Sequence, residues 1–221
     1  MARARIRETA GGDAGRLPFA ARAAAALEPS PIERAVFDAT ERLLQETPIA
    51  DLAVAQILAE ADISRTTFYR YFTSKHAVVS ALLEALQAEL VGVMQPWFVR
   101  GDRPPREALT AALDAVADVW ARHRPVFRAS SENWHAEPEL GTPWVAMMDR
   151  FTTDIARQID RERAAGAAPP GVDSRAIART LVWGSERMLY LGGFGLYGDG
   201  MEHESVAALV AIWHGSIYGT P

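Results

Sequence analysis

Hydrophobic residues recur at spacings of three and four along most of the chain, and no segment alternates between apolar and polar positions over the length of a strand. Spacings of three and four place side chains on one face of an α-helix, whereas a strand repeats at every second residue. The pattern therefore predicts an all-α protein of about nine helices. We expect them to cover approximately residues 31–47, 54–61, 64–72, 74–98, 105–123, 125–136, 142–165, 173–197 and 202–218.

Two of the expected helices, 54–61 and 64–72, are separated by only two residues, Asp62 and Ile63. An Asp tolerates the left-handed backbone conformation that a tight turn between helices needs, and Ser64 is a favourable N-cap for the second helix. Two helices joined by so short a turn are typical of a helix-turn-helix motif.

The second helix of this motif carries hydroxyl, phenol and guanidinium groups, and there is no acidic residue from Ser64 to Lys75. Such groups at a helix N-terminus suit the base edges and phosphates of a DNA major groove. The alternative, a solvated helix of an ordinary bundle, stays open on spacing alone. The candidate DNA-binding residues are Ser64, Arg65, Thr66, Thr67, Tyr69, Arg70, Tyr71 and, as a phosphate clamp at the next helix start, Lys75.

The stretch Ser64-Arg-Thr-Thr-Phe-Tyr-Arg-Tyr-Phe72, followed by Ser74-Lys75, resembles the signature of TetR-family transcriptional regulators. Three later segments resemble the EthR-like branch of that family: Ala164-Ala-Gly-Ala-Ala-Pro169, Ser185-Glu-Arg187 and Trp213-His-Gly-Ser-Ile-Tyr-Gly219. The resemblance extends over residues 31–219. It implies a three-helix DNA-binding domain at 30–76 and a helical ligand-binding and dimerisation domain at 77–221.

The resemblance also implies partners. A homodimer would form through the last two expected helices, 173–197 and 202–218, and would bind palindromic operator DNA. A largely apolar tunnel in the second domain would take a small, mainly apolar effector. The candidate ligand-binding residues are Leu109, Val116, Trp120, Trp144, Met147, Phe151, Val182, Ser185, Glu186, Tyr190 and Trp213.

The sequence departs from the branch pattern at several of these positions. Val116 and Trp120 stand where the branch has Phe, and Val182 and Ser185 stand where it has two Asn that orient ligands. The identity of the ligand therefore does not follow from the resemblance. Glu186 and a hydroxyl would set the polarity instead, and an acidic side chain there disfavours an anionic ligand.

Composition adds three constraints. The 221 residues are 49% hydrophobic, which allows a sizeable core, and the formal net charge is −5. That charge argues against a general nucleic-acid coat but permits a sequence-specific binder, of which only the contacting face must be basic. Residues 1–29 are rich in Ala, Gly and Arg, so we expect a disordered basic arm. The arm is either a solubilising tail or a segment that reaches DNA.

No pattern typical of an enzyme or a metal site is evident. The five His form no H-E-x-x-H pattern, Cys is absent, and Asp114 and Asp118 share a helix face opposite the apolar one. We therefore expect no catalytic residue, metal or cofactor. The lack of Cys, of a signal peptide and of an apolar run long enough to cross a bilayer leads us to expect a cytoplasmic protein with no membrane partner.

These observations predict a DNA-binding transcriptional regulator. The resemblance implies, as the default of the family, a repressor released from its operator by a small, mainly apolar ligand. The alternative is a small-molecule binding protein without operator function. Ala53, where family members place a Ser or Thr cap, and the acidic residues Asp51, Glu60 and Asp62 near the expected DNA face would favour that alternative.

Overall fold

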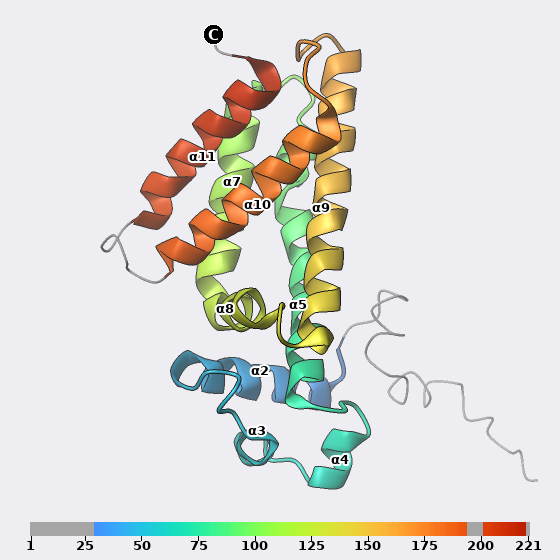
Figure 1. The fold of residues 1–221 in the computed structure, drawn as a ribbon, viewed down its shortest axis with the longest axis vertical. Helices are drawn as coiled ribbons and strands as arrows, with labels where there is room; N and C mark the ends of the chain where they lie inside the picture. The colour runs from blue at the N-terminus through green and yellow to red at the C-terminus, as the bar shows by residue number, and fades with distance from the viewer. Residues whose placement is uncertain (1–28, 194–200, 220–221) are drawn as a thin grey trace, which may run out of the picture. The chain divides into compact units, whose positions relative to one another are not determined.

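The computed structural model describes residues 29–193 and 201–219, with only the backbone of residues 201–204, and every regular element among them is a helix (Figure 1). The prediction of an all-α fold is confirmed. The arm expected at residues 1–29 lies outside the described residues except for Pro29, and so does the end of the helix expected at 173–197. The described helices are α2 (Pro31–Glu46), α3 (Val54–Glu60), α4 (Arg65–Tyr69), α5 (Lys75–Val93), α6 (Gln95–Phe98), α7 (Pro105–Arg122), α8 (Arg124–Asn133), α9 (Pro138–Ala164), α10 (Ser174–Gly192) and α11 (Met201–Tyr218).

The chain divides into two compact units, Met1–Ala81 and Leu82–Pro221. The division falls within α5, so this helix contributes residues to both units. The domain boundary that the sequence predicts, near residue 76, lies in the first turn of the same helix.

The first unit is held by a small aromatic core and by well-formed helix caps. The rings of Phe37 and Phe72 lie 5.8 Å apart, those of Phe68 and Phe72 lie 5.7 Å apart, and Phe68 is fully buried. At the start of α2, the Ser30 hydroxyl accepts a hydrogen bond from the Glu33 backbone N–H, and the Glu33 carboxylate accepts one from the Ser30 backbone N–H. This reciprocal pair satisfies two of the backbone donors that a helix start leaves unpaired.

The turn between α3 and α4 has the geometry that its sequence predicts. Asp62 adopts a φ of 51°, the left-handed region, and the backbone N–H of Ile63 donates to the carbonyl of Leu58 at 3.1 Å. Before α3, Ala53 supplies no side-chain cap, but the Gln56 side-chain oxygen accepts from the Ala53 backbone N–H at 2.8 Å. The missing cap is therefore partly replaced from inside the helix.

The second unit is a bundle in which α9 packs against α10, α10 against α11, and α11 against α7 (Figure 1). Its core is unusually rich in large rings. Trp97 and Trp213 meet edge to face at 5.8 Å, and Trp120 stacks on Phe127 at 4.2 Å with the two planes 12° apart. Trp144 meets Trp120 edge to face at 6.5 Å. Large rings are difficult to pack without gaps, so a cavity in this core is expected.

Two helix boundaries differ from the prediction, and both lie at prolines. The single helix expected at 74–98 is broken at Met94 into α5 and α6, because Pro96 lacks a backbone N–H and its ring obstructs a continuing helix. The described residues therefore hold ten helices rather than about nine. α9 begins at Pro138 rather than near residue 142, and it contains Pro143 within its first turns.

α9 begins this early against the backbone that precedes it. A Cβ atom added at Gly141 would lie 2.4 Å from the Trp134 carbonyl oxygen, so only a glycine permits this approach. The first turns of α9 thus pack against the backbone of a residue outside the helix, and helical spacing alone carries no sign of this contact.

The expectation that no apolar run is long enough to cross a bilayer is wrong for α5. By length and composition, α5 is the one helix among the described residues that could cross a bilayer. The core helix of a soluble protein passes the same test, so this is weak evidence. Buried residues of α5 such as Val78, Leu83 and Leu86 give the apolar character a role in packing.

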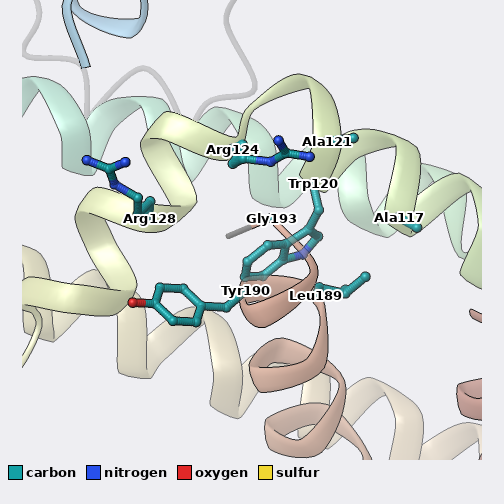
Figure 2. A pocket seen from close by; sticks show the side chains of 8 residues that line it. All are labelled: Ala117, Trp120, Ala121, Arg124, Arg128, Leu189, Tyr190 and Gly193. Carbon is teal, nitrogen blue, oxygen red and sulfur yellow. The ribbon is translucent and has the colours of Figure 1, made fainter. Parts of the chain in front are cut away.

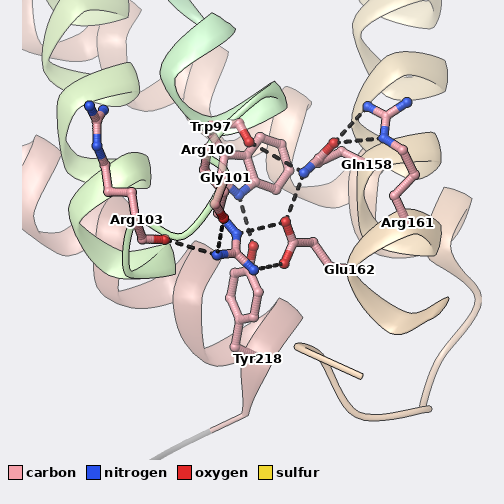
Figure 3. A network of polar contacts seen from close by, with 8 residues as sticks. All are labelled: Trp97, Arg100, Gly101, Arg103, Gln158, Arg161, Glu162 and Tyr218. Atoms are coloured by element: carbon pink, nitrogen blue, oxygen red, sulfur yellow. Dashed lines mark hydrogen bonds and ion pairs between the residues drawn. The ribbon is translucent and has the colours of Figure 1, made fainter. Parts of the chain in front are cut away.

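A polar network is buried at one end of the bundle (Figure 3). The Arg100 guanidinium donates to both carboxylate oxygens of Glu162, at 2.8 and 2.6 Å, and Gln158 donates to the same carboxylate at 2.8 Å. The Trp97 indole donates to the Tyr218 hydroxyl at 2.9 Å. Burial raises the pKa of Tyr218 to about 12, despite the opposing hydrogen bond from Trp97. The network ties the segment after α6 to α9 and to the last turn of α11.

Candidate DNA-binding helix and effector cavity

The helix α4 presents most of the residues that the sequence selects for DNA. Its inner side is anchored by Phe68, which is fully buried, and its outer side exposes Tyr69, with 48% of the side chain accessible. The Arg65 guanidinium lies over the Tyr69 ring, 5.7 Å from its centroid. This cation–π contact holds a cation and a phenol together on one face. The exposed candidates are Ser64, Arg65, Thr66, Tyr69 and Arg70.

The remaining candidates are Thr67, Tyr71 and Lys75, and they lie in the same region as the Ser64 cap. The Ser64 hydroxyl caps α4 by accepting from the Thr67 backbone N–H at 3.1 Å, and it lies 2.9 Å from the Thr67 hydroxyl. Thr67 and Tyr71 are half-buried. Lys75 donates to the carbonyl oxygen of Ala50 at 2.8 Å, so its ammonium group is held against the turn before α3. Lys75 therefore also ties the motif together.

One acidic residue beside the motif is partly neutralised. Glu60 at the end of α3 accepts a hydrogen bond from Arg42 of α2 at 2.8 Å. Both side chains are substantially exposed, so the pair contributes little to stability, but it places a positive charge beside the acid. The Glu60 carboxylate thus opposes an approaching phosphate less than an unpaired acid would.

The second unit contains a partly open cavity of about 70 Å³. Eight of the candidate ligand-binding residues line it, from α7, α9, α10 and α11. It is smaller than the roughly 300–1,000 Å³ of pockets for drug-sized ligands, so the structure holds a compact cavity in place of the expected long tunnel. The candidates on its wall are Val116, Trp120, Met147, Phe151, Val182, Ser185, Glu186 and Trp213.

Two polar side chains interrupt the apolar wall of this cavity. The Ser185 hydroxyl accepts from the Trp213 indole N–H at 3.0 Å. The Glu186 carboxylate accepts from the Ser131 hydroxyl of α8 at 2.6 Å, and the Glu186 side chain is almost fully buried. Burial raises the pKa of Glu186, while the Ser131 hydrogen bond and the charge of Arg187 act in the opposite direction. An acid is therefore held in an apolar setting at the cavity wall.

A second pocket, of about 50 Å³, also has Trp120 in its wall (Figure 2). Trp120 and Leu189 line both spaces, so these two side chains separate the cavity from the pocket. Arg124 and Arg128 stand at its rim with Tyr190, whose hydroxyl donates to Glu132 at 3.1 Å.

Three candidate ligand-binding residues do not reach the cavity. Leu109 and Trp144 are fully buried away from it, and Tyr190 lines the pocket beyond Trp120. The indole N–H of Trp144 is buried and has no hydrogen-bond partner among the described residues. Helical spacing identifies such residues as inward-facing but does not separate cavity wall from solid core.

Six further residues line the cavity and are not among the candidates selected from the sequence. All of these residues are apolar, and several lie on faces that helical spacing marks as buried, which is the one signal the sequence offers for them. They are Leu90, Met94, Leu113, Met148, Ile155 and Leu189.

An apolar groove of about 520 Å³ runs over α10 and α11. Ile212 at its edge is 56% exposed and Val172 is 66% exposed. A Cβ atom added at Gly184, which lines the groove, would meet nothing within 4 Å. These two helices are the ones for which the sequence predicts self-association.

Among the described residues, no group of three or more His, Asp or Glu side chains is arranged to hold a metal ion. The two sites that the chain does offer are an exposed cationic helix within a helix-turn-helix and an apolar cavity in the second unit. This combination defines the class of protein, a ligand-responsive transcriptional regulator.

Comparison with known families identifies the particular family. Residues 36–82 match the model of bacterial regulatory proteins of the tetR family, and residues 109–219 match the model of the C-terminal domain of the transcriptional regulator EthR. The chain belongs to the TetR family, in its EthR-like branch, and is a DNA-binding transcriptional regulator.

Individual relatives agree with this assignment. The HTH-type transcriptional regulator EthR of Mycobacterium tuberculosis is 31% identical over 188 residues, which cover 85% of this chain and 87% of the relative. EthR of Mycolicibacterium smegmatis is 30% identical over 189 residues, with the same coverage.

Solved structures agree in fold. A putative TetR-family regulator from Syntrophomonas wolfei superposes with a TM-score of 0.72 at 15% identity, covering 86% of this chain and 96% of that one. FadR from Bacillus subtilis, solved in complex with stearoyl-CoA, superposes with a TM-score of 0.68 at 14% identity, covering 85% and 99%.

Proposed function

We propose that the protein is a repressor that binds a palindromic operator as a homodimer and leaves it when a small, mainly apolar effector occupies the cavity of the second unit. The observation that carries the proposal is the exposed face of α4, where Arg65, Thr66, Tyr69 and Arg70 are accessible and no acid occurs from Ser64 to Lys75. As an operator-binding protein it would act in the cytoplasm, without an enzymatic activity.

Each exposed residue of α4 suggests a role. Guanidinium groups donate pairs of hydrogen bonds to guanine edges or to phosphates, and Thr66 and Tyr69 offer hydroxyls to either. Because Arg65 packs over the Tyr69 ring, the two side chains present one preorganised contact surface. We expect Lys75 to contribute a phosphate contact only after its hydrogen bond to Ala50 is released or shared.

The groove over α10 and α11 supports the dimer. A twofold interface is self-complementary, so an exposed apolar surface on two neighbouring helices can be covered by the same surface of a second copy. Ile212 and Val172 would be buried in this way. The interface would set the spacing between two copies of α4 and hence between the operator half-sites.

The cavity supports ligand control. Its wall is apolar except for Ser185 and Glu186, which is the arrangement expected for a mainly apolar ligand with one polar anchor. A ligand shifts the protein away from the operator only if it binds the released conformer more tightly than the operator-bound one. α5 provides a covalent route for this coupling, because Lys75 belongs to the first unit and Leu90 lines the cavity.

Operator binding is tested on the DNA upstream of the protein's own gene, with random-site selection if that DNA carries no site. Tyr69→Ala is expected to weaken specific binding by about 1–3 kcal/mol, the range for a base contact. Arg65→Ala is expected to weaken it and to reduce the dependence on salt by about one phosphate contact. Gel shifts across a salt series measure both.

Two matched controls make this test specific. Tyr190→Ala removes a tyrosine and Arg157→Ala an arginine from the second unit, and both variants should bind the operator like the unmodified protein. If Tyr69→Ala and Arg65→Ala also retained full affinity, the proposed recognition helix would be wrong. A protein that binds effectors but selects no DNA sequence would instead be a small-molecule carrier.

A further inference from the structure

A buried carboxyl group lies in the wall of the effector cavity. Glu186 is 4% exposed, and it is the one ionisable side chain among the described residues that line this space. Most of the remaining wall is aliphatic, methionine or aromatic. A charge placed in so apolar a wall is costly unless a partner compensates it.

The carboxylate has acceptor capacity beyond its present contacts. One oxygen, Oε1, accepts from the Ser131 hydroxyl at 2.6 Å. The other, Oε2, lies 3.7 Å from the Arg187 side-chain nitrogen Nε, which is beyond hydrogen-bonding distance. Arg187 is 49% exposed and its guanidinium lies over the Tyr190 ring at 4.6 Å, so it neutralises Glu186 only weakly. An ionised carboxylate can accept about four hydrogen bonds, so room remains for a donor from within the cavity.

The aromatic part of the wall is suited to the same kind of ligand. Trp120, Phe151 and Trp213 all contribute to the cavity lining. The face of an aromatic ring attracts a cation, most strongly where water is excluded. A carboxylate and several rings around one small apolar space thus favour positive charge over negative.

We propose that Glu186 anchors effectors that carry a basic nitrogen, so that the effector class is a lipophilic amine whose ammonium group donates to the Glu186 carboxylate. This proposal rests on the proposed function, since it names the ligand of the same cavity. The apolar part of the amine would lie among Met147, Phe151 and Val182. Burial raises the pKa of Glu186, and a bound ammonium would lower it again by stabilising the charged form.

The test compares three probes of equal chain length: hexylamine, hexan-1-ol and hexanoate. Binding to the full-length protein is measured by titration calorimetry at constant ionic strength. The unmodified protein is expected to bind hexylamine about tenfold more tightly than hexanoate, with hexan-1-ol between them, because a charge-assisted hydrogen bond and ring contacts favour only the amine.

The variant Glu186→Gln keeps the shape of the side chain and removes its charge. It is expected to lose about tenfold in affinity for hexylamine and to change by less than about threefold for hexan-1-ol, since only the amine uses the charge. Glu107→Gln is the matched control, because it removes an exposed carboxylate of α7 that is paired with Arg103 and does not line the cavity. It should leave all three affinities unchanged.

The outcomes separate this inference from the proposed function. If hexan-1-ol binds but hexylamine has no advantage over hexanoate, the role of Glu186 is overturned and the cavity remains a ligand site. If the unmodified protein prefers hexylamine and Glu186→Gln retains that preference, the anchor is a different group and the inference is also wrong. If none of the probes binds, the effector cavity itself is overturned, and the inference with it.

Discussion

Replacing Trp120 with alanine tests whether its side chain helps to separate the cavity from the second pocket. Trp120 is 8% exposed, stacks on Phe127 and meets Trp144 edge to face. Truncating a buried tryptophan costs about 3–5 kcal/mol, from lost transfer free energy and from the space left behind. For a chain of this size that corresponds to a fall in melting temperature of roughly 6–20 °C. Thermal unfolding followed by far-ultraviolet circular dichroism measures it.

The same variant should gain a binding site. Removing the indole would join the cavity of about 70 Å³ to the pocket of about 50 Å³, and free indole could then occupy the space. Indole at about one hundred times its dissociation constant would restore about 2.7 kcal/mol of stability. The matched control is Trp134→Ala, because Trp134 is half-buried and lines neither space.

The reasoning would be refuted by either of two results. A loss below about 1 kcal/mol in Trp120→Ala would mean that the surroundings collapse into the space, so that no divided cavity exists. Equal stabilisation by indole of Trp120→Ala and Trp134→Ala would mean that indole binds elsewhere. In the expected case, Trp120→Ala also shifts the effector dose needed to release operator DNA more than it shifts operator affinity in a gel shift.

Three further outcomes are expected. Ser64→Ala removes the cap of α4 and should cost about 1 kcal/mol of stability, with weaker operator binding in a gel shift, whereas Ser64→Asp should retain the stability but weaken operator binding, because it places a carboxylate on the DNA face. Arg100→Ala should lower the unfolding free energy in urea by about 3–5 kcal/mol, because it leaves the buried Glu162 carboxylate with the Gln158 hydrogen bond but without its positive partner, while Arg175→Ala breaks an exposed ion pair and should cost less than about 1 kcal/mol. The raised pKa of Tyr218 means that the folded state holds the phenol proton more tightly, so its contribution to stability is complete below pH 10.0 and is lost as the pH rises to about 12. Tyr218→Phe should flatten the stability profile across that interval in pH-dependent thermal melts.

Local chemistry made part of the fold predictable. The left-handed Asp62 and the Ser64 cap follow from preferences that operate over three or four residues, and both are present. The break at Pro96 was also encoded locally, because a proline lacks the backbone N–H that a continuing helix needs, but the sequence interpretation took 74–98 as one helix. The start of α9 at Pro138 was also encoded locally, because proline is favourable at the first position of a helix, whereas the close approach of Gly141 to the Trp134 backbone was not.

For the cavity, helical spacing predicts which residues face inward but not which of them line the space. Spacing identifies Trp144 and Val182 alike as inward-facing, yet Val182 borders the cavity and Trp144 is packed in solid core. The difference arises from how the side chains of neighbouring helices interlock, which the spacing along one helix does not determine. The buried position of Glu186, by contrast, could be suspected from one acid within an apolar helix face.

The size of the cavity bears on how an effector would act. A space of about 70 Å³ accepts at most a small group, so a larger effector binds only to conformers in which part of the wall has moved. Trp120 and Leu189 are the side chains whose movement would enlarge it, because the pocket lies directly beyond them. The apparent affinity of a large effector is then reduced by the small population of the opened conformer. Trp120→Ala should remove that penalty, so large effectors would gain more affinity from this substitution than small ones.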